Sequence, residues 1–90
     1  MTITTYNHES LQRHGVTPEE ADEVVAFGKW VEMTPSERGN DRLMFVGFTG
    51  EGRLVEVGVE YFDAEDREHI FHADDATQQY ARLLTELGYD

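Results

Sequence analysis

The strongest constraint on the fold is a pair of β-type segments joined by a glycine-rich turn. Val55, Val57 and Val59 occupy alternate positions of segment 53–62, and the side chains of a β-strand point alternately to the two faces of its sheet. Segment 42–48 is mostly apolar, and the string Thr-Gly-Glu-Gly that follows it is typical of a hairpin turn. The sequence therefore predicts two antiparallel strands at 42–48 and 53–62.

Two further segments extend this hairpin into a sheet. Residues 29–33 form a short β-type run that ends at Thr34-Pro35, and residues 67–73 follow the polar turn 63–66. Because consecutive hairpins place neighbouring strands side by side, we expect a three- or four-stranded antiparallel sheet.

The two central strands differ in what they present to the second face of the sheet. Segment 42–48 has apolar side chains on both faces, including Met44 and Phe45. We expect a loop, a second copy of the chain or a partner to cover the face that the helices leave open. In the neighbouring strand, Glu56 and Glu60 oppose the valines, and we expect them to be solvated or to meet a basic partner.

Two helices are predicted before the sheet. Residues 8–14 follow a capping asparagine and precede a glycine. Thr17, Pro18 and Glu20 then form a helix start with a capping box, and this second helix ends at the glycine that follows Phe27. We expect Phe27 and the nearby aromatic side chain at position 30 to pack in the core.

A third helix is predicted to close the chain. Its apolar stripe consists of Ala76, Tyr80, Leu83, Leu84 and Leu87. Asp74 or Asp75 can cap its first turn, and Gly88 can end it. The predicted fold is therefore a single α+β domain over residues 1–90, with two short N-terminal helices, an antiparallel sheet and one C-terminal helix.

Composition excludes several classes of function. The 19 acidic residues outnumber the 7 Lys and Arg residues, which gives a net charge of −12, and the chain has no cysteine. An acidic chain is repelled by bare nucleic-acid phosphates and by anionic lipid, and thiolate chemistry needs cysteine. The sequence also has no apolar run long enough for a membrane span and no signal peptide, so we expect a cytoplasmic protein that does not bind membranes.

Several strings of the sequence resemble the BrnT-type toxins of bacterial toxin–antitoxin pairs, which are small ribonucleases similar in fold to the RelE class. The resemblance covers about residues 7–85. The matching strings are Leu11-Gln12-Arg13-His14-Gly15-Val16-Thr17, Glu19-Glu20-Ala21 with Val24, Asp41-Arg42, Gly50-Glu51-Gly52-Arg53-Leu54-Val55, His69-Ile70-Phe71-His72-Ala73 and Ala76-Thr77.

The resemblance implies a metal-independent endoribonuclease without a cofactor, which pairs with a cognate antitoxin. The sequence departs from the family at residues 72–75, where His-Ala-Asp-Asp stands in place of a string like Ser-Ala-Arg that basic residues follow. The family is typically basic, whereas this chain is acidic. We therefore expect RNA cleavage to be weak or lost, even where the scaffold is kept.

RNA cleavage without a metal needs a proton acceptor for the 2′-hydroxyl, cations for the phosphate and a proton donor for the leaving oxygen. The candidates for proton transfer are His69 and His72, and the candidates for phosphate contact are Arg42, Arg53 and Arg67. We expect Arg42 and Arg67 to share one end of the sheet. The two histidines lie three positions apart in one strand, so they face opposite sides unless a bulge separates them.

Three alternatives remain open at this point. Neighbouring carboxylates could neutralise these arginines, which would leave the chain as a non-catalytic acidic module that docks a basic protein. The apolar second face of 42–48 could instead form a homodimer. The acidity could also be an adaptation of the whole proteome, since the chain has one lysine against six arginines. No metal site is expected, because the acidic and histidine residues lack the spacing of metal ligands.

Overall fold

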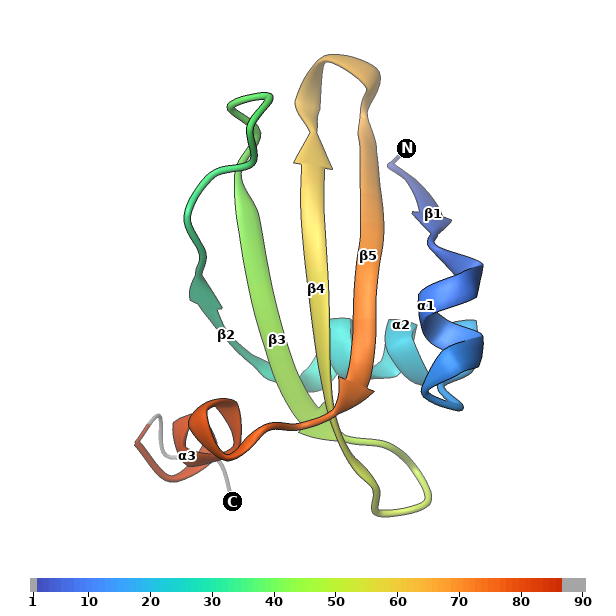
Figure 1. The fold of residues 1–90 in the computed structure, drawn as a ribbon, viewed down its shortest axis with the longest axis vertical. Coiled ribbons are helices and arrows are strands. Elements are labelled where there is room, and N and C mark those ends of the chain that lie inside the picture. Colours follow the sequence, from blue (N-terminus) through green and yellow to red (C-terminus); the bar gives the residue numbers. More distant parts are fainter. Residues whose placement is uncertain (1, 87–90) are drawn as a thin grey trace.

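The computed structural model describes residues 2–86, and these residues form a five-stranded sheet flanked by helices (Figure 1). The elements are β1 (Ile3–Tyr6), α1 (His8–Arg13), α2 (Pro18–Phe27), β2 (Lys29–Glu32), β3 (Arg42–Phe48), β4 (Leu54–Phe62), a 3-10 turn (Asp63–Glu65), β5 (Arg67–Asp75) and α3 (Gln78–Glu86). The fold is α+β, as the sequence predicted.

The sheet is mixed, with the strand order β1-β5-β4-β3-β2. The four strands from β2 to β5 form the predicted antiparallel meander, and β1 adds a fifth strand that runs parallel to β5. The prediction of a three- or four-stranded antiparallel sheet is therefore wrong at this edge. Ile3–Tyr6 has only four residues, and its partners lie 64 positions further along the chain, so no local pattern indicated the pairing.

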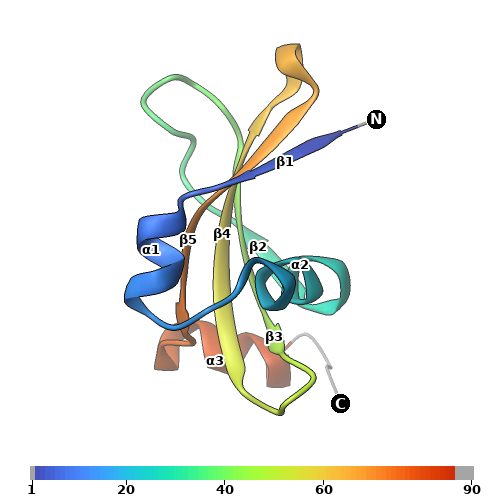
Figure 2. The same ribbon diagram turned by 90° about the vertical axis from the view of Figure 1, so that its right-hand side faces the viewer.

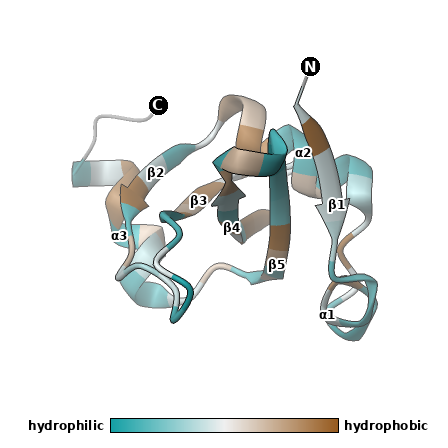
Figure 3. Ribbon diagram, turned by 90° about the horizontal axis from the view of Figure 1, so that it is seen from above, coloured by the Kyte–Doolittle hydropathy of each residue, from teal (hydrophilic) through white to brown (hydrophobic). Residues whose placement is uncertain are grey.

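The two faces of the sheet are covered by different elements. Helix α2 packs against β3 and β4 on the face that carries Val55, Val57 and Val59, which we name the α2 face. Helix α3 packs against β3 and β2 on the other face, which carries Glu56 and Glu60 and which we name the α3 face. Figure 3 shows α2 and α3 on opposite sides of the sheet, and Figures 1 and 2 show α1 beside β5.

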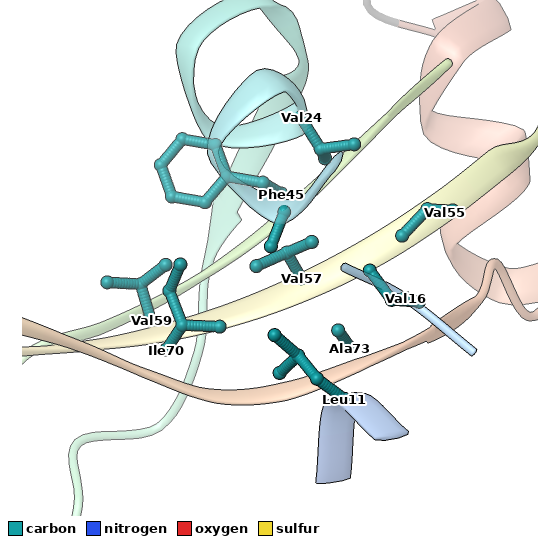
Figure 4. Packing of buried hydrophobic residues seen from close by; sticks show 10 residues of the cluster. Leu11, Val16, Val24, Phe45, Val55, Val57, Val59, Ile70 and Ala73 are labelled. Atoms are coloured by element: carbon teal, nitrogen blue, oxygen red, sulfur yellow. The ribbon is translucent and has the colours of Figure 1, made fainter. Parts of the chain in front are cut away.

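The main hydrophobic core lies between the α2 face of the sheet and the N-terminal helices α1 and α2 (Figure 4). It joins the three valines of β4 to Leu11 of α1 and Val24 of α2. Both N-terminal helices begin as predicted. Asn7 accepts a hydrogen bond from the amide of Ser10, and the complete capping box of Thr17 and Glu20 starts α2.

The second face of β3 is covered by the chain itself. Met44 and Val46 are buried on the α3 face, together with Leu84 of α3. A closing helix therefore covers this face, where we expected a loop, a second copy or a partner. Asp74 and Asp75 do not cap that helix, since they belong to β5. The proposed helix stop at Gly88 lies outside the described residues.

Two aromatic side chains that we expected in the core are exposed. Phe27, the last residue of α2, is 74% exposed, and Trp30 of β2 is 52% exposed. The prediction was wrong for Trp30 because β2 is an edge strand, with no further strand of residues 2–86 beside it, and wrong for Phe27 because the ring lies at the exposed end of α2. No helix within residues 2–86 is long and apolar enough to cross a membrane.

Helix α2 approaches β3 closely at Gly28, which makes this glycine a test of the packing. A Cβ atom at position 28 would lie 2.5 Å from the carbonyl oxygen of Val46 and 2.6 Å from that of Val24. We expect Gly28→Ala to lower the free energy of unfolding by about 1–3 kcal/mol in urea titrations, because backbone atoms have to move. Gly50→Ala is the control, since its nearest neighbour is the flexible Glu23 carboxylate at 3.4 Å.

Candidate functional site

Two of the three candidate phosphate-binding arginines lie at the same end of the sheet. Arg42 at the start of β3 is the register partner of Glu60, and Arg67 at the start of β5 is the partner of Phe62. Register partners share a face, and positions 60 and 62 of β4 share the α3 face. The two arginines therefore flank the end of β4 on one face, which confirms that they share one end of the sheet.

Aromatic rings gather these arginines and a third one, Arg38. The guanidinium carbons of Arg38 and Arg67 lie 5.3 Å and 4.0 Å from the ring centroid of Phe62. The guanidinium carbon of Arg42 lies 5.6 Å from the ring centroid of Phe71. Cation–π attraction at such distances offsets part of the repulsion between like charges. We name Arg38, Arg42 and Arg67 the arginine cluster.

A β-bulge in β5 places His69 and His72 on the same face. Gly58 of β4 pairs with His72, and the next residue, Val59, pairs with Ile70, so Phe71 is an extra residue in β5. The phenyl ring of Phe71 covers Gly58, where an added Cβ atom would lie 2.6 Å from it. The two histidines would face opposite sides in a regular strand, and the bulge, which was the stated exception, places them on one face.

Glu60 lies at the centre of the arginine cluster and is only 5% exposed. Its carboxylate accepts hydrogen bonds from Arg38 at 3.0 Å and 3.3 Å and from the side-chain amide of Asn40 at 2.9 Å. Burial by itself raises the pKa of Glu60, but the hydrogen bonds from Arg38, Asn40 and Ser36 outweigh it and lower the pKa to about 2. Glu60 therefore stays ionised and holds the 33–41 loop on the α3 face.

The three arginines differ in how strongly a carboxylate already holds them. Arg38 is committed to Glu60, and Arg67 lies 3.3 Å from the exposed carboxylate of Glu65. Within residues 2–86, Arg42 has no carboxylate partner, and its Nε donates to the carbonyl oxygen of Thr34 at 2.8 Å. Arg42 also lines an open hollow of about 420 Å³ between the loop and the sheet. Arg42 is therefore the member of the cluster with the most capacity to bind an added anion.

Arg53 is not part of this cluster. Its Nε donates to Asp75 at 2.7 Å, and its two terminal nitrogens donate to the carbonyl oxygens of Gly15 and His14, both at 2.7 Å. The side chain thus joins the end of β5 to the turn after α1. This arrangement matches the alternative that a neighbouring carboxylate neutralises the arginine, and each of the three guanidinium nitrogens of Arg53 already donates a hydrogen bond within the chain.

His69 lies next to the arginine cluster and is linked to it through Thr5. The Nδ1 atom of His69 lies 2.7 Å from the hydroxyl oxygen of Thr5, which accepts a hydrogen bond from Arg67 at 3.1 Å. In the tautomer in which the Thr5 hydroxyl donates to Nδ1, the ring proton is on Nε2. Burial first, and then the charge of Arg67, lower the pKa of His69, which favours a neutral ring at pH 7.

His72 is held by a different set of groups, nearer the other end of β4. Its Nε2 lies 2.8 Å from the carboxylate of Glu56, which is 4% exposed and also accepts from the amide of Thr77 at 2.7 Å. The His72 ring contacts the ring of His14, whose Nδ1 lies 3.3 Å from Asp74. His72 is therefore a hydrogen-bond partner of a buried carboxylate. The expectation that Glu56 and Glu60 form a solvated face is wrong.

Three contributors to this site were not identified from the sequence. Thr5 belongs to the strand that the sequence did not reveal. Arg38 is placed in the site by the fold of the 33–41 loop, and Phe62 by the pairing of β4 with β5. The sequence did contain a pattern from which a partner such as Arg38 could have been predicted. A glutamate on an otherwise apolar central strand needs a cationic partner when it is buried.

Comparison with known proteins does not assign the chain to a family. No protein-family model matches it, and a search of curated proteins finds no match. What the site can do therefore follows from its own chemistry. It presents guanidinium groups, aromatic rings and one neutral histidine on a single face, and this combination fits a phosphate-bearing ligand with planar groups.

The ionised state of Glu60 generates a pH prediction. A carboxyl group with a folded pKa of about 2 against an ordinary value of 4.5 contributes stability that is full above pH 4.5 and is lost as the pH falls towards 2. We expect Glu60→Gln to be less stable than wild type at pH 7 by about 1–2 kcal/mol, with the difference disappearing near pH 2. Urea titrations across this range measure it.

Glu51→Gln in the exposed hairpin turn is the matched control, because it removes the same charge from a side chain that holds no loop. Its stability should follow wild type at every pH. A Glu60→Gln variant that keeps the wild-type pH dependence would show that the loop is held in another way.

Proposed function

We propose that this chain is a toxin–antitoxin-type protein, similar to the BrnT-type ribonuclease toxins, that binds single-stranded RNA through its arginine cluster and cleaves it weakly at most. The sequence resemblance supplies the class of protein and the class of ligand. The contacts on the α3 face support RNA binding, and the histidine environments support the low cleavage activity.

The observation that carries this proposal is the position of Arg42 and Arg67 on either side of the end of β4. Both side chains lie on one face with the rings of Phe62 and Phe71. Guanidinium groups bind phosphate oxygens, and rings offer surfaces on which bases stack. The Arg67–Glu65 ion pair is exposed, and such pairs contribute about 0–1 kcal/mol, so a phosphate can replace the carboxylate.

Cleavage is expected to be weak because the site has one available histidine where the reaction needs two proton-transfer groups. His69 can donate from Nε2, whereas His72 is engaged by the buried carboxylate of Glu56. The net charge of −12 also opposes the approach of a polyanion. Glu60 and Glu65 place two carboxylates at the cluster itself, which limits how much phosphate charge the site can stabilise.

Replacing Arg42 tests RNA binding. We expect wild type to bind a fluorescently labelled single-stranded RNA at low ionic strength, and Arg42→Ala to weaken that binding about tenfold, since a hydrogen bond to a charged group contributes about 1.5–3 kcal/mol. Fluorescence anisotropy measures both. Two or three phosphate contacts predict a slope of about −1.4 to −2.1 for the logarithm of affinity against that of salt concentration.

Arg13→Ala is the matched control for this experiment. Arg13 lies on α1, pairs with Glu9 at 2.7 Å and is outside the cluster, so its loss changes the net charge equally. RNA binding that Arg13→Ala and Arg42→Ala weaken to the same extent would rule out the cluster as the site. Arg42→Lys keeps the charge and should lie between wild type and Arg42→Ala, which separates phosphate contact from a folding defect.

His69 and His72 are expected to differ in their effect on cleavage. Slow cleavage of the RNA should be lost in His69→Ala, whose RNA affinity stays within about twofold of wild type, because a proton donor is removed while the arginines remain. His72→Ala should instead lower the free energy of unfolding by about 1–3 kcal/mol, since Glu56 loses its partner. Growth arrest on induced expression that His69→Ala relieves would agree with this assignment, whereas cleavage unchanged by His69→Ala would contradict it.

A further inference from the structure

An open pocket of about 400 Å³ lies on the α2 face, at the end of the sheet away from the β3–β4 hairpin turn. Leu43 and Tyr61 lie on this face because each is two positions away from a core residue of its own strand, β3 or β4. Trp30 of the edge strand β2 pairs with Phe45 of β3. The apolar lining consists of Trp30, Met33, Pro35, Leu43 and Tyr61, and the polar lining of Glu32, Asp41, Arg42 and Asp63.

The apolar part of this pocket is unusually accessible. The Trp30 side chain is 52% exposed, whereas Leu43 and Tyr61 are partly buried beside it at the margin of the core. An accessible tryptophan next to apolar side chains is typical of the residues that contribute most to protein–protein binding. The pocket can therefore bind one aliphatic or aromatic side chain of a partner.

The charged side chains around the pocket indicate which charge a bound partner segment should carry. Glu32, Asp41 and Asp63 are exposed, and none of them forms an ion pair with another described residue. Arg42 is the one cation in the lining, and it is bonded to a carbonyl oxygen. Three carboxylates around the apolar part of the pocket attract a positively charged segment of a partner and repel an acidic one.

We propose that this pocket binds a basic segment of another protein, with one apolar side chain seated on Trp30 and Tyr61 and with arginine or lysine side chains beside Glu32, Asp41 and Asp63. The pocket lies on the α2 face and shares Arg42 and Pro35 with the hollow on the α3 face, but its apolar lining and its three carboxylates are not part of the RNA site, so the inference goes beyond RNA binding and does not depend on it. A cation above the indole ring adds cation–π attraction to the charge pairing.

Trp30 is the only tryptophan in the chain, so its fluorescence reports occupancy of the pocket directly. The probe is a short synthetic peptide with several arginines around a single leucine, and its comparison is the same peptide with serine in place of leucine. We expect the leucine peptide to shift the Trp30 emission to shorter wavelength in a saturable way. The serine peptide should bind at least about tenfold more weakly.

Two double variants separate specific binding from general attraction by an acidic protein. Asp41→Asn with Asp63→Asn should weaken binding of the labelled leucine peptide about five- to tenfold, because two charge pairs with the peptide are lost. Glu37→Gln with Glu51→Gln removes the same charge outside this pocket and should leave affinity within about twofold. Trp30→Ala should abolish binding by fluorescence anisotropy, while Phe27→Ala, which removes an exposed ring outside the lining, should not.

Three results would overturn the proposal. The first is equal weakening by the two double variants, and the second is equal binding of the leucine and serine peptides, because either one reduces the effect to net charge. The third is self-association in sedimentation experiments that Trp30→Ala abolishes, which would make a second copy of the chain the occupant. None of these results bears on RNA binding, which the Arg42 variants test separately.

Discussion

Two glutamate side chains are buried on the central strand β4, and the groups that hydrogen-bond to each one decide how the α3 face is covered. Glu60 is held by Arg38 and Asn40 of the 33–41 loop, and Glu56 is held by His72 and by the amide of Thr77 just before α3. A buried acceptor without a partner costs about 1–3 kcal/mol. The loop at one end of this face and the closing helix at the other are therefore each joined to β4 by a carboxylate.

The same requirement explains how an acidic chain collects positive charge in one place. Glu60 recruits Arg38, and the rings of Phe62 and Phe71 then let Arg67 and Arg42 lie nearby. The bulge at Phe71 is part of this arrangement, because it turns the ring over Gly58 and brings His72 onto the face that His69 shares with the arginines. A cationic surface thus forms around one buried anion, in a protein whose other surfaces are mostly acidic.

Local signals in the sequence were sufficient for most elements and insufficient for the site. The capping box at Thr17, the hairpin turn at 49–52 and the alternation in β4 depend on neighbouring residues, and each was predicted correctly. The bulge, the pairing of β1 and the burial of Glu56 and Glu60 depend on residues distant in sequence. The placement of Arg42 and Arg67 at one end of the sheet could be predicted from the antiparallel order of the strands alone. The roles of Thr5 and Arg38 could not be predicted in this way.

The parallel pairing of β1 with β5 has a consequence for how the protein is made. Ile3–Tyr6 is synthesised 64 positions before Arg67 to Ile70, the residues with which it pairs. While the intervening residues are made, this strand lacks its β5 partner, and its two threonines and tyrosine remain in contact with water or with other chains. The link from Arg67 through Thr5 to His69 can form only after the first residues of β5 have been synthesised, so this part of the α3 face depends on a contact between distant segments of the chain.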